Sequence, residues 1–161
     1  MDYEANIACF ARVARTFCEW CESPVPPETD SEGLAFEALS VLSAVYAAAF
    51  GLPDTECPEA PDAERPTDEQ RKALQPKLAR LPVRYYWSFF VPSQLEAEEP
   101  VVGDLADDYT DIYCDLREGL WLYDRGHVQA AVWNWRFTFG IHWGHHATDA
   151  MYALQAHESS T

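Results

Sequence analysis

The chain contains 161 residues, 48% of them hydrophobic and 14% aromatic, and its 27 acidic and 11 basic residues give a formal net charge of −16. This length and apolar content predict one globular domain, a helical bundle over residues 1–157, followed by a flexible C-terminal tail at 158–161. The negative charge repels phosphate backbones and anionic lipids, which argues against nucleic-acid or membrane binding and favours a basic protein partner or a metal cation.

The N-terminal residues and the cysteines predict a cytoplasmic protein. The opening MDYEANIACF is acidic where a signal peptide would be basic, and no apolar run approaches the length of a membrane span. Cys18 and Cys21 have the spacing of a redox pair, but the surrounding pattern is helical, no strand precedes them and no second pair completes a zinc site. We therefore interpret the cysteines as reduced thiols: Cys9, Cys18, Cys21, Cys57 and Cys114.

The first half of the chain predicts two long helices and a short one. Apolar residues recur at helical spacing over 3–22 and 31–50, and a proline-containing segment follows each run. A proline-rich surface loop is expected over 52–66. Thr67 begins a capping-box pattern, so a short helix should start there and be disturbed at Pro76.

Two further long helices are predicted in the second half, over 104–124 and 128–156, with a turn at Gly126 between them. The aromatic run over 85–90 is too short for its periodicity to distinguish a helical turn from an extended segment. No alternating strand pattern and no internal repeat is found. The sequence therefore predicts an all-α fold, an antiparallel up-and-down bundle of four main helices plus one or two short helices.

Glycine and tryptophan are unusual features of the last predicted helix. Gly140 and Gly144 each cost a helix about 1 kcal/mol relative to alanine, which indicates a close backbone approach or a bend beside the neighbouring histidines. Trp133, Trp135 and Trp143 fall on different sides of the helix, which predicts that other elements cover it.

An acidic stripe runs along the helix predicted over 104–124. The segment GDLADDYTDIYCDLREG, residues 103–119, places its acids on one arc and its large apolar residues on another. Like charges at these spacings weaken a helix by about 0.2–0.5 kcal/mol per pair, so solvent, the helix dipole or a counterion must offset the repulsion. The stripe consists of Asp104, Asp107, Asp108, Asp111, Asp115 and Glu118.

The last helix contains histidines that can partner this stripe. His142, His146 and Asp149 share one face because they are four and three residues apart. Folding the last two helices as a hairpin about Gly126 sets the acids and the histidines at the same height. The pairs of residues expected at the same height are Asp111–His142, Asp107–His146, Asp108–His145 and Asp104–Asp149.

Three interpretations of this cluster are open. Both histidines can be hydrogen-bonded to Asp107 and Asp111, forming a buried network that fixes the register of two helices. The cluster can instead hold a divalent metal such as Mg²⁺, Mn²⁺, Fe²⁺ or Zn²⁺, or it can consist of exposed residues with no common role. Arg117 or Arg136 could supply positive charge without a metal. The candidate metal ligands are Asp104, Asp107, Asp108, Asp111, Asp115, His142, His146 and Asp149.

The residues of the last two helices resemble those of a known family. The pattern D-D-x-x-D-I-Y-x-D-L occurs at 107–116 and H-W-G-x-H at 142–146. Together they are similar to an uncharacterised bacterial family catalogued as domain of unknown function five-zero-six-three, closely so over about 100–157. The resemblance implies a small all-helical fold and no assigned activity. The run at 107–111 is also similar to the magnesium motif of prenyl-diphosphate enzymes, but those enzymes are far longer and need a second acidic motif.

Two functions fit the sequence. The first is a non-catalytic binding protein whose acidic surface attracts a basic protein partner. The second is a divalent-metal-dependent hydrolase acting on a phosphorylated or nucleotide-like small molecule, with the metal activating water. The chain lacks a phosphate-cradling glycine loop, a serine elbow and a cysteine–histidine nucleophile pair, which favours the binding protein. Neither a catalytic residue nor an oligomeric state is predicted.

Overall fold

The fold is mainly helical, as predicted, and it also contains a small two-stranded sheet that was not predicted. It is described by a computed structural model that covers residues 3–91, 93 and 99–158. The helices are α1 (Tyr3–Glu22), α2 (Ser31–Ala49), α3 (Asp68–Leu78), α4 (Leu105–Asp124), α5 (Val128–Thr138) and α6 (Gly144–Glu158). The π-helical segment η1 (Phe139–Trp143) connects α5 to α6, and the strands are β1 (Tyr85–Ser88) and β2 (Val101–Asp104).

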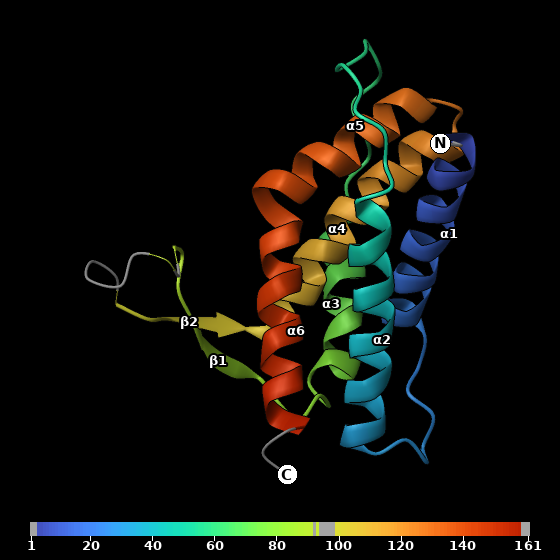
Figure 1. Cartoon of the computed structure of the whole chain (residues 1–161). Coiled ribbons are helices and arrows are strands. Elements are labelled where there is room, and N and C mark those ends of the chain that lie inside the picture. Colours follow the sequence, from blue (N-terminus) through green and yellow to red (C-terminus); the bar gives the residue numbers. More distant parts are fainter. Residues whose placement is uncertain (1–2, 92, 94–98, 159–161) are drawn as a thin grey trace.

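Helix α4 lies at the centre of the bundle, where it packs against α1, α3, α5 and α6. Helix α2 packs against α1 and α6. Figure 1 shows the long helices side by side, with α1 and α2 running in opposite directions, α4 and α6 running in opposite directions, and both strands projecting from one side. Helix α4 also contacts η1 and α6, so part of its acidic stripe lies at the interface with the histidine-bearing segment.

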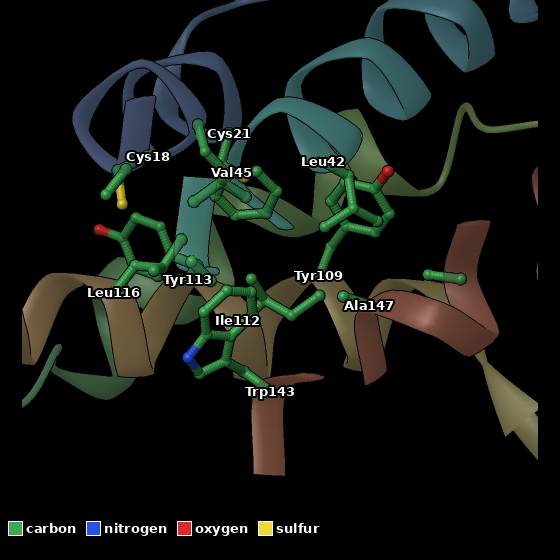
Figure 2. Packing of buried hydrophobic residues seen from close by; sticks show 14 of the residues in the cluster. Cys18, Cys21, Leu42, Val45, Tyr109, Ile112, Tyr113, Leu116, Trp143 and Ala147 are labelled. Atoms are coloured by element: carbon green, nitrogen blue, oxygen red, sulfur yellow. The ribbon is translucent and has the colours of Figure 1, made fainter. Parts of the chain in front are cut away.

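The core is built from one apolar face of each long helix. Phe10 and Phe17 of α1, Ile112 of α4 and Trp135 of α5 are fully buried, and each such side chain stabilises the fold by about 1.5–3 kcal/mol relative to an exposed one. Figure 2 shows part of this cluster, in which side chains from several helices meet: Cys18, Cys21, Leu42, Val45, Tyr109, Ile112, Tyr113, Leu116, Trp143 and Ala147.

Helix α2 belongs to this core. By length and composition it could cross a bilayer, so the expectation that no apolar run approaches that length is wrong; it is the one helix among the described residues with that property. Core helices of globular proteins often have the same property, and Leu34, Leu42 and Val45 of α2 are buried against the other helices. A third of the apolar stretch is buried in this way (33%), so packing accounts for part of its apolar composition.

Helix α3 begins as predicted and extends further than expected. The Thr67 hydroxyl accepts a hydrogen bond from the backbone N–H of Gln70, and the Gln70 side chain accepts one from the backbone N–H of Thr67. The expected disturbance at Pro76 does not end the helix, which continues to Leu78. Leu74 and Leu78 are buried, so packing holds the last turn although proline lacks a donor there.

The two strands connect the middle of the chain to α4. β1 pairs antiparallel with β2, with Tyr86 opposite Gly103, so the aromatic run, for which a helical turn and an extended segment were both open, contains a strand. Four-residue strands are too short to give a clear alternating pattern. Asp104 ends β2 and is the N-cap of α4, because its carboxylate accepts a hydrogen bond from the Ala106 N–H at 3.0 Å.

The last predicted helix is interrupted by η1, and Figure 1 shows that the chain axis changes direction between α5 and α6. A Cβ on Gly144 would collide with the carbonyl oxygen of Phe139, whereas a Cβ on Gly140 would meet nothing within 4 Å. Gly144 therefore permits the π turn, which confirms the expected close backbone approach at one of the two glycines. A π turn contains one residue more than an α turn, so it displaces His142 from its place in a regular helix.

Candidate metal centre

Three aspartates of α4 meet two histidines across the interface between α4 and the C-terminal segment. Asp108, Asp111 and Asp115 are three and four residues apart, so they share one face of α4. His142 belongs to η1, and His146 belongs to the first turn of α6. Packing of α4 against both segments brings the carboxylates and the imidazoles into direct contact.

Each imidazole is held through its Nδ1 atom by a carboxylate of α4. His142 Nδ1 lies 2.7 Å from Asp115 Oδ2, and His146 Nδ1 lies 2.7 Å from Asp108 Oδ1. These are short hydrogen bonds, in which the ring N–H donates to the carboxylate. A proton on Nδ1 leaves the lone pair of a neutral imidazole on Nε2, so both rings are oriented as metal ligands.

The Nε2 atoms of both imidazoles face Asp111. Asp111 Oδ2 lies 3.5 Å from His146 Nε2 and 3.9 Å from His142 Nε2, distances that are too long for direct hydrogen bonds. The exposed fractions of the side chains are 37% for Asp111, 44% for His142 and 29% for His146, so solvent reaches the space between them.

The spacing of these three residues suits one metal ion. One ligand atom from each of Asp111, His142 and His146 lies within 4.8 Å of the others. Zn²⁺ binds nitrogen and oxygen ligands at about 2.0–2.2 Å, so two atoms on one ion are separated by at most about 4.4 Å. Both distances to the Asp111 oxygen, 3.5 and 3.9 Å, fall within this limit.

A tyrosine of the sheet supports the carboxylate behind His146. Asp108 is buried, and its second oxygen accepts a hydrogen bond from the Tyr86 hydroxyl at 2.5 Å. Burial and this hydrogen bond raise the pKa of Tyr86, so the phenol remains the donor. A Cβ on Gly103 would collide with the Tyr86 ring, so the glycine opposite Tyr86 makes room for this contact.

Electrostatics at the centre favour a cation. The hydrogen bond that His146 donates to Asp108 raises the pKa of His146, burial opposes this effect, and the charges of Asp108, Asp111 and Asp107 add to it. Burial and the neighbouring charges of Asp111 and Asp104 raise the pKa of Asp107. The negative charges of neighbouring aspartates contribute to both shifts, and a bound cation would neutralise part of this charge.

The two segments meet as expected, but the predicted partners are wrong, and the partner of His142, Asp115, lies one helical turn beyond the expected Asp111. The imidazoles are hydrogen-bonded to Asp108 and Asp115, not to Asp107 and Asp111 as the network interpretation supposed. Counting residues from a turn fixes the height of a side chain, but a step of one residue rotates it by about 100° around the helix. The π turn adds a further displacement at His142.

The remaining candidate ligands lie apart from the three that converge. Asp104 caps α4 and lies 3.8 Å from Arg84 Nε. Asp107 is exposed, and Asp149 accepts a hydrogen bond from the Ser88 hydroxyl at 2.7 Å. These three aspartates line a pocket beside the imidazoles rather than joining them.

The arginines that could have replaced a metal contact other residues. Arg117 pairs with Glu22 at 3.1 Å, and Arg136 lies 3.6 Å from Asp54. Glu118, the last acid of the stripe, pairs with Arg65 at 2.9 Å. None of these ion pairs involves the carboxylates that contact the histidines.

A pocket of about 550 Å³ opens beside the two imidazoles and is bounded by the sheet and α6. The sequence did not identify its wall from the sheet, because the pairing of the strands was not predicted. The available signal was the aromatic run over 85–90, whose periodicity could not distinguish a helical turn from an extended segment. The residues that complete the wall are Tyr86, Ser88, Phe89, Phe90, Val101, Val102, Gly103, Ile141, His145 and Thr148.

Comparison with known proteins supports the fold and the family. The crystal structure of protein BF1032 from Bacteroides fragilis is similar to this structure, with a TM-score of 0.75 and 23% sequence identity over 93% of this chain and 90% of that chain. At this identity the likeness shows the fold alone. A search of curated proteins found no match. The family described as Domain of unknown function (DUF5063) matches residues 1–160, and the chain therefore belongs to that family, as the resemblance implied.

Proposed function

We propose that the protein is a cytoplasmic, metal-dependent hydrolase in which Asp111, His142 and His146 hold one divalent transition metal ion. Two imidazoles and one carboxylate suit Zn²⁺, Fe²⁺ or Mn²⁺ better than Mg²⁺, which prefers oxygen ligands and water. Zn²⁺ is the best fit, because catalytic zinc sites combine three protein ligands with one open position.

One observation carries this proposal: both imidazoles use Nδ1 for a hydrogen bond to a second carboxylate and direct Nε2 toward the same Asp111 oxygen. A network built only to join two helices needs one carboxylate for each histidine, and Asp108 and Asp115 already fill that role. It gives no reason for a third carboxylate that lies beyond hydrogen-bond distance of both rings. A metal held between the three residues does give a reason.

The geometry beside the centre supports a reaction on a small molecule. A divalent ion at such a site acts as a Lewis acid and lowers the pKa of a water molecule into the neutral range. The adjoining pocket of about 550 Å³ is large enough for a small molecule next to the ligands. In a hydrolysis the oxygen of water bonds to the electrophilic atom of the substrate, and the leaving group departs with a proton.

Metal binding tests this proposal directly. The purified protein is stripped with chelator and titrated with Zn²⁺ and with Co²⁺, using calorimetry and the visible absorption of Co²⁺. We expect one ion per chain and, at metal concentrations about 100-fold above the dissociation constant, stabilisation of about 2.7 kcal/mol. His142→Ala, His146→Ala and Asp111→Asn should each abolish this response. His145→Ala is the matched control, because His145 is exposed and lies outside the convergent set.

The contrary result is equally clear. A wild-type protein that binds neither ion and whose thermal unfolding is unchanged by metal or chelator would overturn the proposal. A His145→Ala protein that loses the metal as completely as His146→Ala would instead show that the ligands are assigned wrongly.

A second candidate function is the non-catalytic binding of a basic protein partner. The net charge of −16 supports it, together with the exposed aromatic side chains of Trp87 in β1, Phe90 after β1 and Tyr152 in α6. Exposed apolar side chains on a negatively charged protein surface suit a partner whose binding surface contains both apolar and basic residues. The absence of any metal response in the titration would favour this candidate over the hydrolase.

A further inference from the structure

The pocket beside the candidate metal centre has an acidic wall with no lysine or arginine among the described residues that line it. The wall contains Asp104, Asp107, Asp108 and Asp149. One divalent ion bound at Asp111 would leave an excess of negative charge around the pocket. A phosphorylated or nucleotide-like substrate, as considered from the sequence, would therefore meet uncompensated repulsion there.

We infer that the substrate of this site is a small amphipathic molecule that carries a protonated amine, an inference that rests on the proposed function for the reaction itself. Asp107 and Asp149 are the residues that would receive the amine. Asp107 has no hydrogen bond or ion pair with another described residue, so its carboxylate is available to a ligand. Asp149 accepts one hydrogen bond, from Ser88, and a carboxylate can accept several.

The other two acids of the wall are already engaged. Asp108 is bonded on both oxygens, by His146 and by Tyr86. Asp104 caps α4 and lies near Arg84. The two carboxylates that remain for a cationic ligand are therefore those of Asp107, on α4, and Asp149, on α6.

Apolar side chains provide the complementary part of the site. Phe89 and Phe90 follow the first strand, and Ile141 projects from η1, so all three line the same pocket as the acids. A second recess of about 740 Å³ lies along β1 and α6 and shares Phe89 and Asp149 with the first. An aromatic or aliphatic group of the ligand can lie against these side chains while its amine contacts a carboxylate.

Three probes of matched size test this inference: phenylbutylamine, phenylbutanol and phenylbutyrate, with phenyl phosphate as a fourth. Each is titrated into Zn²⁺-loaded protein by calorimetry. We expect the amine to bind at least about tenfold more tightly than the alcohol, and the two anions to bind more weakly than the alcohol. Asp107→Asn and Asp149→Asn should each reduce the preference for the amine by about threefold to tenfold.

Two control variants separate charge from structure. Ser88→Ala removes the hydrogen bond to Asp149 and keeps its charge, so the preference for the amine should persist. Asp62→Asn removes an exposed carboxylate outside this pocket and should have no effect. Equal affinities for amine and alcohol in the wild type, or an unchanged preference in both Asp→Asn variants, would overturn the inference.

The same titrations on His142→Ala protein distinguish this inference from the proposed function. The recognition of the amine depends on Asp107 and Asp149 and not on the metal, so the preference should survive the loss of the metal ligand. A protein that binds no metal and still selects the amine would overturn the hydrolase and support the inference. A protein that binds metal and selects phenyl phosphate would overturn the inference alone.

Discussion

Tyr86 and His146 hydrogen-bond to the two oxygens of one buried carboxylate, that of Asp108, at 2.5 and 2.7 Å. A strand of the sheet is thereby connected to a candidate metal ligand of α6 through a residue of α4. The connection explains why a projecting sheet is joined directly to the start of α4. It also makes the orientation of the imidazole depend on a hydroxyl that belongs to a distant part of the chain.

The first prediction concerns this hydroxyl. Tyr86→Phe leaves the ring in place and removes the donor, so Asp108 keeps a buried oxygen without its hydrogen-bond partner and holds His146 less firmly. Loss of such an outer contact lowers metal affinity by about tenfold or more. Calorimetric titration with Zn²⁺ measures the change. Tyr85→Phe is the control, because Tyr85 is exposed on the same strand. Equal affinities of the Tyr86→Phe protein and the wild type would show that the contact does not reach the metal centre.

A second prediction concerns the pH response of the metal-free protein. Asp108 raises the pKa of His146 through their hydrogen bond, burial opposes the shift, and Asp111 and Asp107 add to it. NMR titration of the imidazole should therefore place the His146 pKa above the ordinary value of about 6.5. Asp108→Asn should lower it. A pKa that stays the same in the Asp108→Asn protein would contradict the assigned cause.

The same shift fixes the sign of its contribution to stability. The pKa of His146 is higher in the folded than in the unfolded protein, so its stabilising effect is complete below about pH 6.5 and is lost as the pH rises through the folded-state value. Chemical denaturation at a series of pH values measures the free energy of unfolding. The loss at rising pH should be smaller in the Asp108→Asn protein, which lacks the carboxylate that stabilises the charged ring.

The long helices could be predicted from the sequence because each repeats its apolar pattern over many turns. The observed bounds of α1, Tyr3–Glu22, agree with the predicted 3–22, and α4 begins at Leu105 against a predicted start at 104. The same periodicity placed the acids on one face of α4 and the histidines on one face of the last helix. It therefore identified the two surfaces that meet at the candidate metal centre.

The details of the centre depend on contacts that periodicity does not encode. Tyr86 reaches Asp108 only because Gly103 lies opposite it, and no local pattern relates two positions seventeen residues apart in four-residue strands. The choice of Asp108 over Asp107 is a difference of one residue on a helix, which counting from the turn cannot resolve. The π turn at η1 depends on the collision that Gly144 avoids, and a glycine alone indicates a bend without specifying its form.

A third prediction concerns the two cysteines with redox spacing. Burial raises the pKa of both Cys18 and Cys21, whereas Cys9 and Cys57 are exposed. The thiolate is the reactive form, so iodoacetamide should modify Cys9 and Cys57 in the native protein and spare Cys18 and Cys21 until denaturant is added. Mass spectrometry of the digested protein locates the label. Rapid labelling of Cys18 or Cys21 under native conditions would contradict their burial and restore the redox interpretation.

The fourth prediction uses the two glycines of the last segment as a matched pair. A Cβ on Gly144 would collide with the carbonyl oxygen of Phe139, whereas a Cβ on Gly140 would meet nothing within 4 Å. Gly144→Ala should therefore lower the free energy of unfolding by about 1–3 kcal/mol. Gly140→Ala should be neutral or should stabilise the protein by up to about 1 kcal/mol, since alanine favours a helix. Urea denaturation measures both changes.

The two substitutions should also differ in their effect on metal binding. The π turn that Gly144 permits places His142 against Asp115 and toward Asp111, so an altered turn moves one imidazole away from the other two ligands. Zn²⁺ affinity should therefore fall in the Gly144→Ala protein and remain unchanged in the Gly140→Ala protein. If Gly144→Ala lowers stability and leaves Zn²⁺ affinity intact, the π turn serves helix packing alone and His142 reaches its position without it.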